Sequence, residues 1–176
     1  MTKELHFSTW GSWSGARQEE TEDISPSQDG FRAFMGWDGV MVADPSVGLV
    51  DMCRAFMEKV KEESCGQCYP CRLGTHEMWQ LLEGFCSGKG RGEDIERLRS
   101  LAVLIKDSSK CGIGLTSTRP VLDVLNQYPH LFEQALDQGG VPRGTYVARF
   151  SAPCSQACPS HLDIPGYVDM IRMGRI

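Results

Sequence analysis

The sequence predicts a mainly α-helical fold, with a small four-helix bundle over residues 36–140. Two observations favour this fold. Apolar residues recur at spacings of three and four in successive segments, which is the period of an amphipathic helix. Breaker runs such as "SGKGRG" at residues 87–92 separate those segments. We therefore expect helices joined by short connections.

The elements are expected in the following order. The run "GWDGVMVAD" at residues 36–44 resembles a short strand, and a first helix follows within residues 45–64. A second helix covers residues 71–86. The third, residues 93–110, has acidic residues in its first turn and lysines near its end, which suits the helix dipole. Residues 119–140 complete the series, with proline at the starts and glycine at the end.

Two segments flank the bundle. Residues 1–35 mix glycine, serine, tryptophan and acidic residues without periodicity, so we expect a linker or a disordered or docking arm, with Trp10 and Trp13 favouring docking weakly. Residues 141–176 are interpreted as a linker and the start of a further, apparently truncated domain, with a short helix from near Ile164.

Composition narrows the function classes. The chain of 176 residues has 18 Lys and Arg against 23 Asp and Glu, a net charge of −5 that does not favour nucleic-acid binding. No window reaches the roughly 18 apolar residues of a membrane span, and the start lacks the apolar run of a signal peptide. We expect a cytoplasmic protein, whose 8 cysteines are then metal ligands or redox centres more often than disulfides.

The cysteines predict a metal centre. Cys65, Cys68 and Cys71 lie at two-residue spacings, with a proline before the third, in the turn between the first two helices. Cys111 lies in "CGIGLTST", which we expect to be a loop between later helices. Antiparallel packing brings both turns to one end of the bundle. The predicted ligand set is therefore Cys65, Cys68, Cys71 and Cys111.

Two kinds of metal group compete for this set. Three thiolates at two-residue spacing suit one face of a 4Fe-4S cubane, with backbone amides directed at the cluster. Structural zinc sites also use four cysteines, but they usually bring two separated pairs. The three-plus-one arrangement favours the iron-sulfur cluster, while zinc and unligated thiols remain alternatives. Cys53 and Cys86 are interpreted as buried small apolar side chains.

These residues also carry a family resemblance. The segment from "GVMVAD" through "ESCGQCYPCRLG" to "KCGIG" resembles the C-terminal iron-sulfur domain of the NADH-binding flavoprotein subunit of respiratory complex I. The same domain recurs in NAD-linked hydrogenases and formate dehydrogenases. The resemblance implies a four-helix bundle whose 4Fe-4S cluster takes electrons from FMN and passes them on. The FMN and NADH domain of that family has no counterpart here, so no catalytic site is expected in this chain alone.

The tail carries a second resemblance. Cys154-x3-Cys158-Pro159 and the helix after it look like the opening of the iron-sulfur domain of the glutamate synthase small subunit. The near upstream cysteines of that family are missing, and downstream ones would lie beyond Ile176. The resemblance thus implies that Cys158, with or without Cys154, ligates a second cluster completed by residues outside this chain. Two unligated thiols are the alternative.

Two functions follow from these patterns. The first is an iron-sulfur electron-transfer module of an NAD(P)H-linked flavoprotein oxidoreductase, with FMN or FAD and NAD(P)H on other domains or subunits. Its partners would be a flavin- and NAD(P)-binding domain or subunit and other iron-sulfur subunits. The alternative is a helical adaptor, stapled by zinc or by a redox-silent cluster, that assembles partner subunits.

Overall fold

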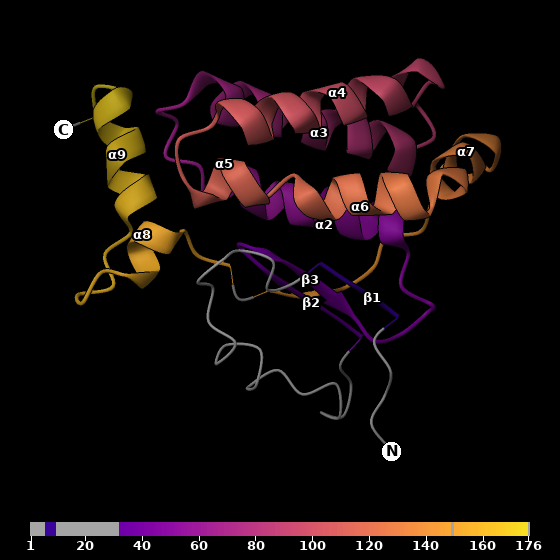
Figure 1. Cartoon of the computed structure of the whole chain (residues 1–176), viewed down its shortest axis with the longest axis horizontal. Coiled ribbons are helices and arrows are strands. Elements are labelled where there is room, and N and C mark those ends of the chain that lie inside the picture. The colour runs from indigo at the N-terminus through magenta and orange to yellow at the C-terminus, as the bar shows by residue number, and fades with distance from the viewer. Residues whose placement is uncertain (1–5, 10–31, 149, 176) are drawn as a thin grey trace.

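The computed structural model describes residues 6–9, 32–148 and 150–175. Figure 1 shows helices lying over one face of a small sheet, with the last two helices at one end of the bundle. Most of the expected arm, including Trp10 and Trp13, lies outside the described residues. The elements are β1 (Phe7–Ser8), β2 (Ala33–Gly36), β3 (Gly39–Val42), α2 (Leu49–Glu62), α3 (Tyr69–Cys86), α4 (Glu93–Ser108), α5 (Gly112–Thr116), α6 (Arg119–Gln127), α7 (Pro129–Asp137), β4 (Val147–Ala148), α8 (Pro153–Gln156) and α9 (Ile164–Arg172).

The helices confirm the mainly α fold. α2 packs chiefly against α3, and α3 against α4. Helices α2, α3, α4 and α6 each bury an apolar stripe at helical spacing, which is why these segments form helices that associate. Phe85 and Phe132 meet edge to face, with ring centroids 5.4 Å apart. The fully buried side chains of the bundle include Met52, Phe56, Met57, Met78, Leu82, Phe85, Leu98, Ile105, Leu125 and Phe132.

The sheet has the strand order β1-β3-β2-β4. β1 and β2 both pair antiparallel with β3, whereas β4 pairs parallel with β2, with Phe34 opposite Val147. Because side chains alternate across a strand, Val40 and Val42 join the helical core while Met41 lies with Phe34 on the other face. The sheet therefore ties the segment before the bundle to the segment after it.

Several segments differ from their expected form. β1 and the start of β2 fall within the expected arm, and the strand-like run 36–44 supplies the second strand of a hairpin. The sequence expected as the loop "CGIGLTST" contains α5. Cys71 lies in the first turn of α3 rather than in a turn between helices. No helix within the described ranges is long and apolar enough to cross a membrane.

A buried carboxylate anchors the segment that leads to β4. Asp51, on the first turn of α2, has a fully buried side chain. It accepts hydrogen bonds from Arg54 Nε at 2.7 Å, the Gly144 amide at 2.7 Å and the Tyr146 hydroxyl at 2.9 Å. Arg143 Nη1 adds a contact of 3.2 Å. Charge-assisted bonds of this kind are stronger than neutral ones, so Asp51 fixes residues 143–146 against the bundle.

The end of α3 supplies a stability prediction. Gly88 has φ +71°, and a Cβ there would lie 2.1 Å from the carbonyl oxygen of Gly139. We expect Gly88→Ala to lower the free energy of unfolding by about 2 kcal/mol or more. Alanine is disfavoured in the left-handed conformation, and its Cβ would also clash with the backbone of Gly139. Gly92→Ala is the matched control, because a Cβ at Gly92 meets nothing within 4 Å and its φ is −57°. Urea unfolding monitored by circular dichroism measures both, and equal midpoints would contradict the prediction.

Candidate metal centre

The first three predicted ligands come from the junction of α2 and α3. α2 ends at Glu62, and Cys65 lies in the short connection that follows. Cys68 is the N-cap residue of α3, and Pro70 occupies its first turn, where the missing proline N–H would be unpaired in any case. Cys71 lies in the same turn, and helical side chains point back toward the N-terminus. The local fold therefore directs all three thiols to the start of α3.

The fourth predicted ligand comes from the start of another helix. Cys111 is the N-cap residue of α5, immediately after α4. Its backbone is extended, with φ −134° and ψ 172°, and its carbonyl accepts from the amide of Leu115 at 3.0 Å. α5 packs against both α3 and α4. This packing brings the start of α5 to the start of α3.

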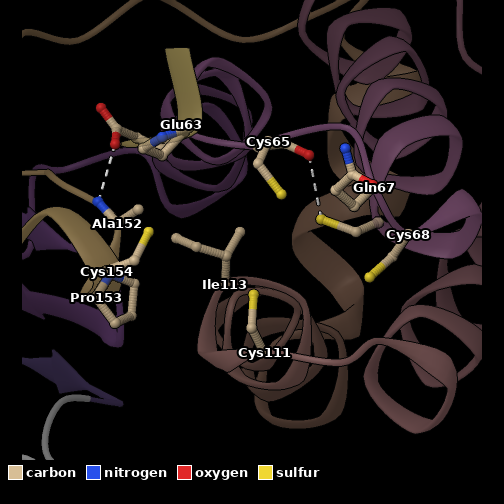
Figure 2. Close-up of a pocket in the computed structure, with 12 residues that line it drawn as sticks. Glu63, Cys65, Gln67, Cys68, Cys111, Ile113, Ala152, Pro153 and Cys154 are labelled. Atoms are coloured by element: carbon tan, nitrogen blue, oxygen red, sulfur yellow. Dashed lines mark hydrogen bonds between the residues drawn. The ribbon is translucent and has the colours of Figure 1, made fainter. Parts of the chain in front are cut away.

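All four thiols line one pocket. Figure 2 shows the sulfur atoms of Cys65 and Cys111 pointing into it from opposite sides. Glu63, Ser64, Gln67 and Ile113 complete the wall on the bundle side. Within the described ranges, no three His, Cys, Asp or Glu side chains form a group suited to a single metal ion. The thiols therefore surround a space rather than meeting at a point.

Burial and nearby negative charge hold the Cys71 thiol protonated before a metal binds. Burial raises the pKa of Cys71 to about 11, and negative charge on Cys111, Cys68 and Cys65 adds to that increase. A hydrogen bond between the Ser64 hydroxyl and the Cys71 sulfur, at 3.4 Å, acts in the opposite direction. Since the thiolate is the form that binds metal, loading the site releases protons.

The cysteine loop is stabilised on its outer side. Arg72 donates to the carbonyl oxygen of Gly66 at 3.3 Å and lies 4.6 Å from the centre of the Tyr69 ring. Gly66 has φ +75°, and a Cβ there would lie 2.7 Å from Arg172 Nε of α9. Glycine is thus favoured by the left-handed backbone, and the side chains of Asp169 and Arg172 on α9 lie close against it. The loop is held between Arg72 and the tail.

The tail closes the pocket and separates the two remaining predicted ligands. Ala152, Pro153 and Cys154 line the pocket, whereas Cys158 is not among its lining residues. Backbone amides of Leu162, Ser160 and His161 donate to the Cys158 sulfur and lower its pKa.

The second cluster expected at Cys154 and Cys158 stays a prediction. Nothing in the sequence indicated that Cys154 returns to the first four cysteines, because its position depends on how the tail folds back.

The two cysteines interpreted as apolar side chains are both buried. Cys53 is fully buried on α2, and Cys86 is 5% exposed at the end of α3. Burial raises the pKa of Cys86 to about 12 and that of Cys53 still further. Neither residue lines the pocket. They therefore belong to the packing of the bundle.

Known proteins resemble this chain in sequence and in structure. It is 32% identical to the NADP(+)-dependent formate dehydrogenase subunit beta of Moorella thermoacetica, over 98% of this chain and 31% of that protein. It is 31% identical to the NADPH-Fe(3+) oxidoreductase subunit beta of Geobacter sulfurreducens, over 94% of this chain and 26% of that one. A solved NAD+-reducing [NiFe]-hydrogenase in the H2-reduced state matches 55% of this chain and 17% of its own, with a TM-score of 0.52 and 33% identity.

The match to a family is confined to the bundle and the cysteine site. This chain spans between a quarter and a third of the length of these curated relatives. Residues 51–135 match the family described as the NADH-ubiquinone oxidoreductase-F iron-sulfur binding region. That range contains all four pocket cysteines of the bundle and helices α3 to α6 in full. Residues 51–135 of this chain therefore belong to the NADH-ubiquinone oxidoreductase-F iron-sulfur binding region family.

Proposed function

We propose that Cys65, Cys68, Cys71 and Cys111 hold a 4Fe-4S cluster, and that this chain is an electron-transfer module of an NAD(P)H-linked flavoprotein oxidoreductase. One observation carries the proposal: thiols from the starts of two different helices line a single pocket. A cubane binds one thiolate at each iron, so its ligands must surround a space. The pocket supplies that arrangement.

The zinc alternative fits this geometry less well. Zinc–sulfur bonds of about 2.3 Å place the four sulfurs of a tetrahedral site about 3.8 Å apart, around a single ion. Here the four thiols line a shared pocket, and within the described ranges no three of them are grouped around a single ion, which suits a larger group. The adaptor function, which depended on zinc or on a redox-silent cluster, is accordingly not favoured.

The residues around the pocket define what the protein contributes. When bound, a 4Fe-4S cluster takes up and passes on single electrons. The four thiolates would fix its irons, and the apolar side chain of Ile113 together with Pro165 limits the access of water. Exposure to water and hydrogen bonds to sulfur set the potential of such a centre. Arg72 directly follows Cys71 and donates a hydrogen bond to Gly66 O. It would place a positive charge beside the negatively charged thiolates.

The proposed partners follow from the relatives. Their names describe subunits that use NADP(+), NADPH or NAD+, and this chain matches only a part of each. We infer that FMN or FAD and NAD(P)H bind to other domains or subunits, and that further iron-sulfur subunits or a second 4Fe-4S cluster lie on the same electron path. The cytoplasmic location expected from the sequence belongs to the same proposal.

Anaerobic reconstitution tests this function. The chain is expected to take up about four irons and four sulfides and to show the broad visible absorption of sulfur-to-iron charge transfer. Reduction with dithionite should decrease this absorption. The reduced protein should show the EPR signal of a cubane. Metal analysis provides the opposing outcome: stoichiometric zinc with no iron, from cells supplied with both metals, would overturn the proposal.

A further inference from the structure

The cluster pocket contains a fifth thiol. Cys154, in the short helix α8, lines the same pocket as the four bundle cysteines. Figure 2 shows Cys154 among the residues that line the pocket, with the side chain of Ile113 between it and Cys65 in this view. Four thiolates complete a cubane, so a fifth thiol at this position exceeds what the cluster requires.

Contacts on both sides of Cys154 fix its position. On one side Ala152 is 2% exposed, and its amide donates to Glu63 Oε2 at 2.9 Å. On the other side Gln156 Oε1 accepts from the indole N–H of Trp37 at 3.0 Å. Two long-range hydrogen bonds, one to the end of α2 and one to the β2–β3 hairpin, therefore bracket the residue. Its place at the pocket follows from tail packing.

Cys111 is the bundle cysteine that shares these surroundings most closely. A Cβ on Gly112, the residue after Cys111, would lie 3.2 Å from Pro153, the residue before Cys154. Burial raises the pKa of Cys154, and negative charge on Cys111 and then on Cys65 adds to the increase. Cys111 and Cys154 are both exposed, whereas Cys71 is buried. Cys111 and Cys154 are thus the two exposed thiols among the five that line the pocket, and the residues next to them are in contact.

We propose that Cys154 is a reserve ligand of this site, which binds the cluster in place of Cys111 when the Cys111 thiolate is removed. The proposal rests on the proposed function, because it requires a cluster held by the bundle cysteines. In the exchange the Cys154 thiol releases its proton to water, and its thiolate forms the iron–sulfur bond that Cys111 no longer makes. No electron is transferred in this step.

Paired alanine variants of the full chain test the proposal. Alanine is used because serine oxygen can itself bind iron. After anaerobic reconstitution, Cys154→Ala is expected to keep about four irons, and Cys111→Ala is expected to keep a cubane with a shifted EPR signal. The double variant Cys111→Ala/Cys154→Ala is expected to lose at least half of the iron that Cys111→Ala retains. Cys111→Ala/Cys158→Ala is the matched control and should equal Cys111→Ala, because Cys158 does not line the pocket.

Alkylation provides a second measurement that does not depend on how well the double variant folds. The loaded proteins are treated with iodoacetamide and digested, and modification of Cys154 is read by mass spectrometry. Cys154 should react in the loaded wild-type chain and be protected several-fold in loaded Cys111→Ala. Reaction of Cys154 at the same rate in both proteins would overturn the proposal, as would a Cys111→Ala chain that holds only three irons.

The two proposals fail in different ways. If the wild-type chain takes up no iron, the proposed function fails and the reserve ligand fails with it. If the wild-type chain loads fully but Cys111→Ala and the double variant retain equal iron, only the reserve ligand is overturned. If the wild-type chain loads fully but Cys111→Ala loses all its iron, the reserve ligand is likewise overturned and the proposed function stands.

Discussion

Replacing Cys71 with alanine is expected to reduce the iron bound after reconstitution from about four atoms per chain to less than one. Cys71 is the most enclosed of the four bundle thiols, at 6% exposure, and lies in the first turn of α3. The residue before Cys154 packs next to Gly112, beside Cys111, so the proposed reserve thiol is not expected to replace Cys71. Iron and sulfide analysis with visible absorption measures the loss.

Cys86→Ala is the matched control for that variant. Cys86 lies at the opposite end of the same helix, is buried to the same degree and does not line the pocket. It should load with iron as the wild-type chain does, although the small cavity left by the thiol lowers stability by about 1 kcal/mol. Equal iron loss in the two variants would show that the effect comes from the stability of α3 rather than from ligation.

Replacing Asp51 with alanine is expected to give the largest loss of stability, about 3–5 kcal/mol. The variant leaves the mostly buried Arg54 without its nearest carboxylate, although Glu58 remains at 3.0 Å. The Gly144 amide and the Tyr146 hydroxyl lose their acceptor in the same step. Chemical unfolding followed by circular dichroism measures the change. A loss below about 1 kcal/mol would indicate that this carboxylate acts like a surface ion pair.

Glu62→Ala provides the control for the role of burial. Glu62 makes an ion pair of 2.7 Å with Lys59, but both side chains are about half exposed. Exposed pairs of this kind contribute well under about 1 kcal/mol. Both ion pairs have a distance of 2.7 Å. A difference in the stability lost by the two variants therefore reports the burial of the Asp51 carboxylate and not the length of its ion pair.

The contribution of Asp51 also depends on pH. Burial acts to raise its pKa, but hydrogen bonds from the Gly144 amide, Arg54 and Tyr146 outweigh burial and hold the pKa below its usual value. A lowered pKa in the folded state stabilises the protein above the unfolded value of about 3.9, and this stabilisation is lost as pH falls through the folded pKa. The difference between wild type and Asp51→Asn should thus be constant near neutral pH and shrink below about pH 4.

The bundle and the convergence of its four cysteines on one pocket were largely predictable from the sequence because their signals are local. Helical periodicity, prolines at helix starts and the two-residue cysteine spacing each depend on neighbouring residues. The predicted set Cys65, Cys68, Cys71 and Cys111 needed one further step, the packing of α5 against α3, and the pocket brings these residues together.

The rest depended on contacts between distant segments. β2 lies in the segment expected to be an arm, and its second partner β4 becomes available only after the bundle. Asp51 carried a signal that could have been recognised, since it is a charged residue among apolar ones at the start of α2. Its partners at residues 143–146 could not be deduced from spacing. The position of Cys154 at the pocket could not be deduced from spacing either, because it depends on contacts between the tail and the bundle.

The parallel pairing of β4 with β2 has a consequence for how the protein matures. During synthesis from the N-terminus, the β2–β3 hairpin and all four bundle cysteines are made before residues 147–154. A nascent chain at that stage has an open hairpin edge and a cysteine pocket that lacks its wall of Ala152, Pro153 and Cys154. Under the proposed function, delivery of iron and sulfide to this open form would meet less steric obstruction than delivery to the finished fold. The order of the segments along the chain thus provides an interval in which the pocket is accessible before the tail covers it.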